Sequence, residues 1–210
     1  MKTRRQLISS AIALLSGAAA ANSNSRIQGD HSMTAHASPK MLVVYFSRTG
    51  ENYSVGYIST GNTAIAADMI ADKTGAECFE IKPQKAYPEV YRECTDQAQA
   101  EANANARPAV QGDIRVEDYD TIFIGYPIWW SDMPMPVYTF LEKHDWTGKT
   151  IAPFCTNEGS GLANTESSIR KACRGAAVLR GLALRGTTAQ KNPEAAEKSV
   201  SDWLRSVVLK

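Results

Sequence analysis

The sequence lacks an excess of charge of either sign. It has 23 lysines and arginines against 22 aspartates and glutamates, and its formal net charge is +1. A chain so balanced is not expected to bind nucleic acid or an acidic membrane surface. Its 43% hydrophobic and 21% charged residues are typical of an ordinary globular protein, which excludes the disordered and fibrous classes.

A long apolar run is missing as well, so we expect no stable membrane span in the mature chain. The nearest candidate lies at the N-terminus, where Lys2, Arg4 and Arg5 precede a short segment rich in alanine and serine. This pattern predicts a signal peptide over residues 1–21, and the adjacent arginines are typical of twin-arginine export. An ordinary secretory signal or an uncleaved anchor is the alternative. The predicted location is therefore outside the cytoplasm, in the periplasm or cell envelope.

Two segments follow the predicted signal. Residues 22–39 are polar and have no periodicity, which predicts a flexible linker. Residues 40–210 are long enough to bury a single core without disulfides, so we predict one domain there. Loss of the signal removes three positive charges and no acidic residue, which takes the net charge to about −2.

Cysteines are few, and their spacing does not suit a metal. Cys78, Cys94, Cys155 and Cys173 include no Cys-x-x-Cys pair, so we expect no metal site. Two disulfides are an alternative in an oxidising compartment. We expect buried or partly buried free thiols instead, because a chain exported in the folded state closes its core where thiols stay reduced.

Apolar runs and helical patterns alternate from Lys40 onward. Helical patterns end at Gly75, begin at Pro136, and begin again after the capping residue Asn192. This alternation predicts a doubly wound α/β fold, with a five-stranded parallel sheet and helices on both faces. The apolar runs 41–46, 120–126 and 150–155 predict strands buried on both faces, and 77–81 and 177–186 supply the second and fifth strands.

Three informative loops follow these strands, at the sheet edge where open parallel sheets bind their ligands. The first, "SRTG" at 47–50, offers hydroxyls and backbone N–H groups to a phosphate, or forms a tight turn. The second, "GYPIWW" at 125–130, offers aromatic rings to a flat ligand, unless the tryptophans pack under the next helix. The third, "CTNEGSG" at 155–161, offers backbone amides to the polar edge of a ring, or is a surface turn.

Together these loops resemble those of the flavodoxin-like family, in the branch that carries "VYFSRTG", "GNT" and "GYPIWW". The resemblance covers the chain from Lys40 to the C-terminus. It implies the strand order 2-1-3-4-5 and a noncovalently bound FMN where the strand order reverses. Together with the predicted signal peptide, the resemblance therefore implies an exported flavodoxin.

The phosphate loop of this chain differs from the continuous loop that is usual in the family. Residues 51–60 separate Gly50 from Gly61. We interpret them as an insertion that splits one loop into two parts and carries Tyr53 and Tyr57 toward the cofactor. Two independent anion sites are the alternative, but only the second part adjoins a predicted helix start.

The resemblance also implies which residues contact FMN. Its phosphate is expected at the split loop, its ring at the loop after the third strand, and its pyrimidine edge at the loop after the fourth. We assign no catalytic role to His144 or Glu158. The expected site residues are Ser47, Arg48, Thr49, Gly50, Gly61, Asn62, Thr63, Pro127, Ile128, Trp129, Trp130, Thr156, Asn157 and Gly159.

The function that the resemblance implies is electron transfer between FMN and a partner protein or a small donor or acceptor. Two features differ from the electron-shuttle members. A charge near neutrality gives little steering toward a charged partner. Pro127 and Ile128 stand where shuttles often have a glycine whose peptide flips toward the reduced ring.

Two alternatives of other classes remain. One is an FMN-dependent NAD(P)H or quinone oxidoreductase, although the sequence shows no nicotinamide-binding motif. The other is a non-redox anion-binding module on the same fold. A receiver module needs carboxylates after its first and third strands, and the residues at 47–49 and 125–127 provide none.

Overall fold

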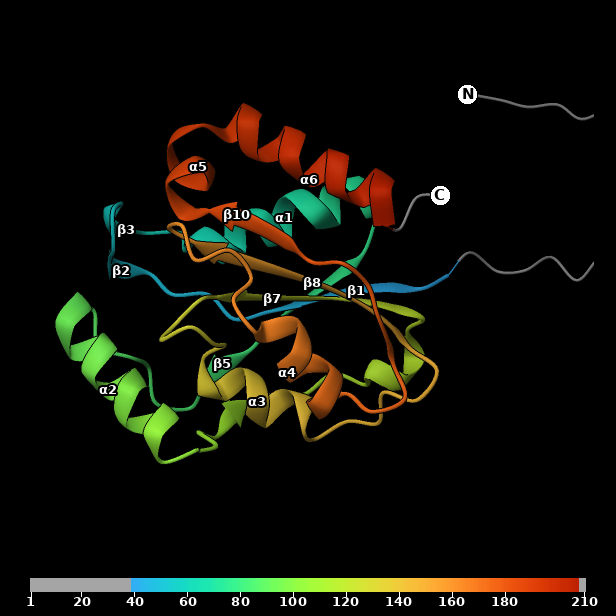
Figure 1. Cartoon of the computed structure of the whole chain (residues 1–210), viewed down its shortest axis with the longest axis horizontal. Helices are drawn as coiled ribbons and strands as arrows, with labels where there is room; N and C mark the ends of the chain where they lie inside the picture. Colours follow the sequence, from blue (N-terminus) through green and yellow to red (C-terminus); the bar gives the residue numbers. More distant parts are fainter. Residues whose placement is uncertain (1–38, 208–210) are drawn as a thin grey trace, which may run out of the picture. The chain divides into compact units, whose positions relative to one another are not determined.

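The computed structural model describes residues 39–207. Its main sheet has the order β4-β1-β7-β8-β10, and all of its pairings are parallel. Numbered by their order along the chain, these five strands have the order 2-1-3-4-5. Figure 1 shows these strands side by side through the middle of the molecule. The predicted fold class and strand order are therefore confirmed. The strands are β1 (Met41–Tyr45), β4 (Glu77–Glu80), β7 (Thr121–Pro127), β8 (Thr150–Asn157) and β10 (Leu182–Arg185), with a short β9 (Ala177–Val178) that pairs with β8.

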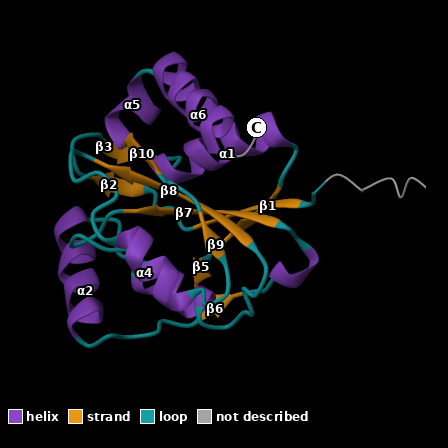
Figure 2. Ribbon diagram, turned by 45° about the vertical axis from the view of Figure 1, so that its right-hand side comes forward, coloured by secondary structure: helices purple, strands orange, loops and turns teal. Residues whose placement is uncertain are grey.

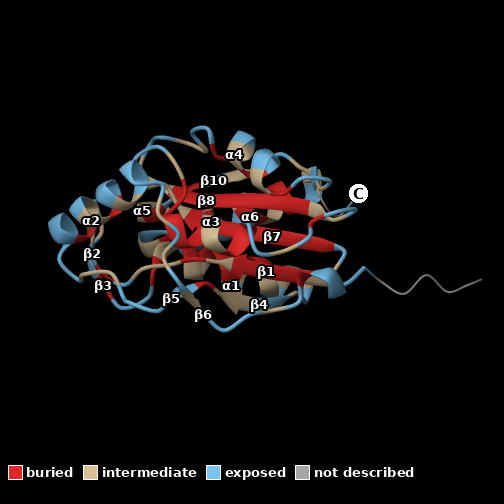
Figure 3. Cartoon of the chain, turned by 90° about the horizontal axis from the view of Figure 1, so that it is seen from below, coloured by how far each residue is buried: buried red, intermediate tan, exposed pale blue. Residues whose placement is uncertain are grey.

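Helices cover both faces of the sheet because each buried strand presents apolar side chains alternately to either side. In β1, Leu42 and Val44 pack in the cluster that includes α3 and α4, whereas Val43 packs in the cluster that includes α1, α5 and α6. Figure 3 shows the central strands almost entirely buried. The helices are α1 (Asn62–Thr74), α2 (Tyr91–Asn103), α3 (Met135–Leu141), α4 (Thr165–Ala172), α5 (Gly186–Lys191) and α6 (Pro193–Val207).

Helix ends agree with the signals in the sequence. Helix α1 ends at Gly75, whose left-handed φ of 70° suits glycine. Helix α6 begins at Pro193, and the side chain of Asn192 accepts a hydrogen bond from the N–H of Ala195 at 3.1 Å.

The fifth strand is divided, which the sequence did not predict. Leu179 still donates its N–H to Ile151 in β8, but the next two residues bond to side chains. Trp203 Nε1 donates to the carbonyl of Arg180, and the N–H of Gly181 donates to the carboxylate of Glu166. A β-hairpin and a separate antiparallel strand pair were also not predicted. They are β2 (Gly50–Asn52) with β3 (Gly56–Ile58), and β5 (Lys82–Pro83) with β6 (Val110–Gln111). A 3₁₀ turn, η1 (Val116–Asp118), precedes β7.

The cysteines are thiols in this structure. Cys94, Cys155 and Cys173 are buried and Cys78 is exposed. Within residues 39–207 there is no cluster of three or more potential metal ligands, and none of the helices is long and apolar enough to cross a membrane. The predicted signal peptide and nearly all of the predicted linker lie outside the described residues.

Candidate functional site

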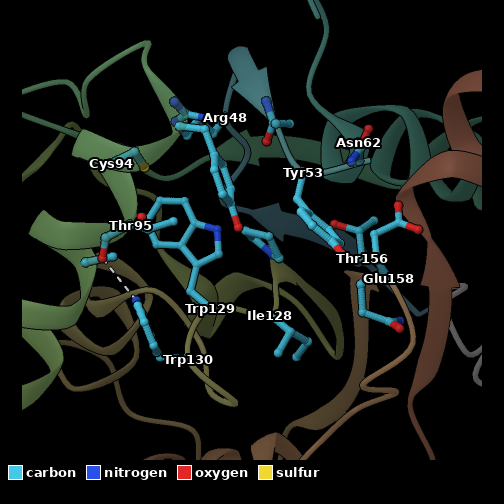
Figure 4. Close-up of a pocket in the computed structure, with 15 residues that line it drawn as sticks. Arg48, Tyr53, Asn62, Cys94, Thr95, Ile128, Trp129, Trp130, Thr156 and Glu158 are labelled. Atoms are coloured by element: carbon cyan, nitrogen blue, oxygen red, sulfur yellow. Dashed lines mark hydrogen bonds between the residues drawn. The ribbon is translucent and has the colours of Figure 1, made fainter. Parts of the chain in front are cut away.

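A cavity of about 280 Å³ lies beyond the carboxyl ends of β1, β7 and β8. The β7 and β8 loops and the start of α1 form one wall, and the β2–β3 hairpin and the start of α2 form the other (Figure 4). Of the predicted site residues, Ser47, Thr49, Gly50, Gly61, Thr63 and Gly159 do not line this cavity. Those that do are Arg48, Asn62, Pro127, Ile128, Trp129, Trp130, Thr156 and Asn157.

The two halves of the split loop meet in space. Ser47 Oγ accepts a hydrogen bond from the N–H of Ala64, in the first turn of α1, at 3.0 Å. Gly61 approaches the other half so closely that a Cβ there would lie 2.2 Å from Ser47 Oγ and 2.6 Å from the carbonyl oxygen of Arg48. The residues on either side of the insertion therefore form one turn, which leads from β1 into α1.

The start of α1 is suited to an anion. Its N-cap is Gly61, which provides no side-chain capping bond, and its first turn contains no acidic residue. The positive end of the helix dipole is thus not neutralised by the helix itself. Asn62, the first residue of α1, lines the cavity, and its Oδ1 atom is buried without a hydrogen-bond partner.

The threonines predicted at the site have different surroundings. Thr63 is buried, and its hydroxyl lies 2.8 Å from the hydroxyl of Thr156, a bond that joins the start of α1 to the end of β8. Thr49 is exposed on the loop after β1. Thr63 and Thr156 therefore hold the two elements together, whereas Thr49 is accessible from solvent.

Arg48 binds protein carbonyls with its guanidinium group. Its Nη2 atom donates to the carbonyls of Pro88 and Glu89 at 2.6 and 2.8 Å, and Nη1 donates to the carbonyl of Glu51. Its Nε atom is buried without a partner. Gly50, with φ of 82°, packs so closely on Glu89 that a Cβ there would lie 3.0 Å from its carbonyl oxygen. Arg48 thus connects the inserted hairpin to the segment before α2.

The loop after β7 is held by backbone bonds. The N–H of Ile128 donates to the carbonyl of Thr156 at 2.9 Å, and Trp129 and Asp132 exchange two backbone hydrogen bonds. The ring of Trp129 packs edge-on against Phe46 and Tyr87, with centroid distances of 5.4 and 5.0 Å. Trp129 therefore belongs to the core side of the loop.

Trp130 differs from its neighbour. It is 53% exposed, has a φ of 49°, and donates from Nε1 to the carbonyl of Thr95 in α2 at 3.0 Å. One tryptophan of the pair packs and the other is exposed, as one interpretation of the sequence predicted.

The loop after β8 is shaped by two side chains. Asn157 Oδ1 accepts hydrogen bonds from the N–H groups of Gly159 and Gly161 at 2.8 and 3.1 Å. The carboxylate of Glu158 accepts hydrogen bonds from the backbone N–H and the hydroxyl of Thr187 at 2.7 and 3.0 Å. The Glu158 carboxylate is thus already hydrogen-bonded at the start of α5.

Sequence reasoning missed the contribution of α2. Tyr91, Cys94, Thr95 and Ala98 line the cavity. The helix is polar and largely exposed, and its composition gives no signal for a ligand site. The buried Cys94 is the exception, and burial raises the pKa of its thiol to about 11, so the group stays neutral at physiological pH.

The fold and the site together identify the family. The flavodoxin family model matches residues 40–205, and the chain belongs to the flavodoxin family. Family membership confirms the predicted cofactor, FMN. No curated protein matches the chain significantly.

Solved structures with the same fold are also flavoproteins by name. A protein from Bacteroides eggerthii, assigned as a flavoprotein, is 30% identical with a TM-score of 0.65, over 82% of this chain and 100% of that one. A similar protein from Bacteroides uniformis is 30% identical, also with a TM-score of 0.65, over 80% of this chain and 99% of that one. A Lactobacillus acidophilus flavoprotein in complex with FMN is 24% identical with a TM-score of 0.55, over 72% and 95%, and shows the shared fold.

The residues of the site fit a phosphorylated flavin. The turn formed by the split loop lies at the start of α1, where Gly61 provides no side-chain cap, and helix starts of this kind bind phosphates. The buried Arg48 Nε and Asn62 Oδ1 atoms offer a donor and an acceptor that no protein group satisfies. The rigid loop after β7 offers a flat, mostly apolar surface beside them.

Proposed function

We propose that the chain is an FMN-dependent redox protein that works outside the cytoplasm. The observation that carries the proposal is the union of the two loop halves at the start of α1, beside the aromatic loop after β7. A helix start suited to a phosphate, which Asn62 connects to the cavity, and a flat apolar surface in the cavity wall match the two ends of FMN.

We assign a role to each part of the site. Ser47, Thr49, Gly50, Gly61, Asn62 and Thr63 form or support the phosphate turn. Pro127, Ile128, Trp129 and Trp130 border the isoalloxazine ring, and Thr156, Asn157 and Gly159 face its pyrimidine edge. Arg48 supports the phosphate turn through the carbonyls that it binds, and its Nε atom faces the buried side of the site.

When bound, FMN supplies the redox chemistry, and the chain positions it. The aromatic loop keeps water from one face of the ring. Glu158, whose charge is directed to Thr187, lies in the same wall and contributes negative potential. A negative potential disfavours an anionic reduced ring, so we expect a low reduction potential.

The simplest test of this function is the flavin content of the purified protein. Denaturation of yellow protein followed by chromatography should release FMN. Release of FAD, or a colourless protein that takes up no added FMN, would contradict the proposal.

The proposed location rests on the N-terminal sequence. If a receptor reads the arginine pair, Arg4→Lys/Arg5→Lys should leave folded, FMN-loaded protein in the cytoplasm, because both changes keep the positive charge. Cell fractionation followed by immunoblotting measures this. Export of the double variant at the normal level would point to the general secretory route.

The electron partner is either a protein or a small molecule. The exposed aromatic rings around the cavity favour a small planar molecule, because their flat apolar faces can stack on it.

A further inference from the structure

Large exposed hydrophobic side chains gather at one place on the described part of the chain. They are Tyr53 and Tyr57 on the hairpin, Val90 and Tyr91 at the start of α2, and Trp130 after β7. Figure 2 shows the hairpin and the start of α2 at the same end of the molecule, and all three segments contribute residues to the lining of the flavin cavity (Figure 4). Such a gathering on a soluble domain marks a binding surface.

Three of these rings belong to the cavity itself. Tyr53, Tyr91 and Trp130, which we call the aromatic rim, all line it. The rings of Tyr53 and Tyr91 lie 6.1 Å apart with an interplanar angle of 30°. Figure 4 shows Tyr53 reaching from the hairpin into the cavity. The rim therefore presents flat apolar faces toward the space beside the flavin loops.

The rim is held in place at a conformational cost. Trp130 has a φ of 49°, which a bulky residue rarely adopts, and its indole is fixed by the bond to Thr95. Tyr53 lies on the insertion that divides the phosphate loop, and Arg48 binds that insertion to the segment before α2. Tyr91 donates its N–H to the carboxylate of Glu51 on the same hairpin.

The charges of the cavity exclude an anionic ligand beside the flavin. Among the described residues that line it, Arg48 is the only cation, and three backbone carbonyls already bind its guanidinium. Burial raises the pKa values of Tyr91 and Cys94, so both side chains stay neutral. A nicotinamide dinucleotide would bring phosphates that find no free cation here. An uncharged ring meets no such penalty.

The backbone of the β7 loop favours a partner that takes two electrons together. The peptide N–H between Pro127 and Ile128 is bonded to Thr156, and the ring of Pro127 restricts its neighbour. A flip of this peptide toward the flavin would break that bond. The loop is thus poorly suited to stabilising a one-electron state.

We propose that Tyr53, Tyr91 and Trp130 form a binding site for an uncharged, planar quinone beside the FMN ring. Reduced FMN gives two electrons and two protons to the two carbonyl oxygens of the quinone, which becomes a hydroquinone while FMN returns to its oxidised form. The inference rests on the proposed FMN function and names the substrate class of the same site.

The test uses holoprotein that has been loaded with FMN and reduced anaerobically with dithionite. Mixed with menadione in a stopped-flow instrument, the wild type should show flavin reoxidation whose rate saturates with menadione. Tyr53→Ala should raise the half-saturating concentration about tenfold, as expected for the loss of one stacked ring. Ferricyanide, a small anionic acceptor, should reoxidise the wild type and the variant at equal rates.

Tyr57→Ala is the matched control, since Tyr57 is on the same hairpin but does not line the cavity. Its half-saturating concentration should stay within about twofold of the wild type. A wild-type rate that rises linearly with menadione, or equal effects of the two variants, would overturn the proposal. Saturation of the reoxidation rate with NADP⁺ or with an oxidised redox protein, but not with menadione, would overturn it as well.

A binding measurement separates the rim from the flavin itself. Menadione added to oxidised holoprotein should quench tryptophan fluorescence with a dissociation constant that Tyr53→Ala raises about tenfold. The FMN dissociation constant should change by less than about twofold. An equal loss of FMN affinity would show that Tyr53 only covers the flavin. A chain that binds no FMN would contradict the proposed function instead, and menadione quenching of the flavin-free chain would still test the rim.

Discussion

The two walls of the cavity are held in different ways. The wall formed by the β7 and β8 loops and the start of α1 is fixed by backbone bonds to the sheet and by glycine contacts. The opposite wall, the β2–β3 hairpin and the start of α2, is joined to the first through the hydrogen bonds of Arg48 and through the bond from Trp130 Nε1 to the carbonyl of Thr95. The first wall is what the flavodoxin fold requires for its cofactor. The second carries Tyr53 and Tyr91 of the aromatic rim, on which the proposed quinone site rests.

The largest effect is expected in the first wall, from Gly61→Ala. A Cβ at 2.2 Å from Ser47 Oγ must push the two loop halves apart, because neither backbone can move freely. FMN affinity should fall about 100-fold, or about 2.7 kcal/mol. Equilibrium titration followed by flavin fluorescence measures this.

Ser59→Ala is the control for that substitution, since Ser59 is exposed on the same connection. Its FMN affinity should equal that of the wild type. If Gly61→Ala also bound FMN normally, the split-loop assignment would be wrong.

The next effect tests how the second wall is attached. Arg48→Ala removes three hydrogen bonds from a charged donor to backbone carbonyls, each worth about 1.5–3 kcal/mol. Hydrogen exchange at the Glu51 N–H, which is bonded to Glu89, should accelerate at least about tenfold. The exchange of β7 amides in the first wall should not change. Unchanged exchange at Glu51 would show that Arg48 does not hold the hairpin.

A smaller effect concerns the rigidity of the loop after β7. Reductive titration of the wild type should pass from oxidised to two-electron-reduced flavin with little of the one-electron form. Ile128→Gly should increase that form, because glycine lets the peptide between residues 127 and 128 flip toward the flavin. The flip costs roughly one hydrogen bond, about 1 kcal/mol. Absorbance spectra under anaerobic conditions measure both. A wild type that accumulates mostly the one-electron form would favour a shuttle between proteins.

The smallest effect is a pH dependence at Cys94. Its pKa of about 11 means that the thiolate fraction rises about tenfold per pH unit between pH 7 and 10. Alkylation of Cys94 by N-ethylmaleimide should follow that rise and should be slowed by FMN, whereas Cys78, which lies outside the cavity, should not be protected. Mass spectrometry of the labelled peptides distinguishes the two. Equal protection of both cysteines would mean that FMN acts by global stabilisation.

The first wall could be predicted from the sequence, whereas of the second only the approach of Tyr53 on the insertion could be. Continuous apolar runs and the glycine and proline signals determine β1, β7, β8 and the ends of α1, and the loops after parallel strands must meet at one edge. The roles of Arg48 and α2 depend on contacts between residues about forty positions apart, such as Arg48 with Pro88 and Glu89. Neither periodicity nor local motif encodes such contacts. The resemblance placed Arg48 on the cofactor, whereas the structure shows its guanidinium bonded to backbone carbonyls.

The hydroxyls of the predicted phosphate loop illustrate the same difference. The sequence pattern predicted the same role for Thr49 and Thr63 in the phosphate loop. In the structure, Thr63 is buried against Thr156 and Thr49 is exposed. Spacing alone does not reveal which hydroxyl of such a loop faces a ligand, because that depends on where the helix begins relative to the neighbouring strand.

The central claim is that the split loop binds the phosphate of FMN, and a paired titration tests it most directly. Flavin-free protein should be titrated with FMN and with riboflavin under the same conditions. Because riboflavin has the ring but no phosphate, several lost charge-assisted bonds should weaken its binding by at least about 100-fold. Equal dissociation constants for the two flavins would contradict the account.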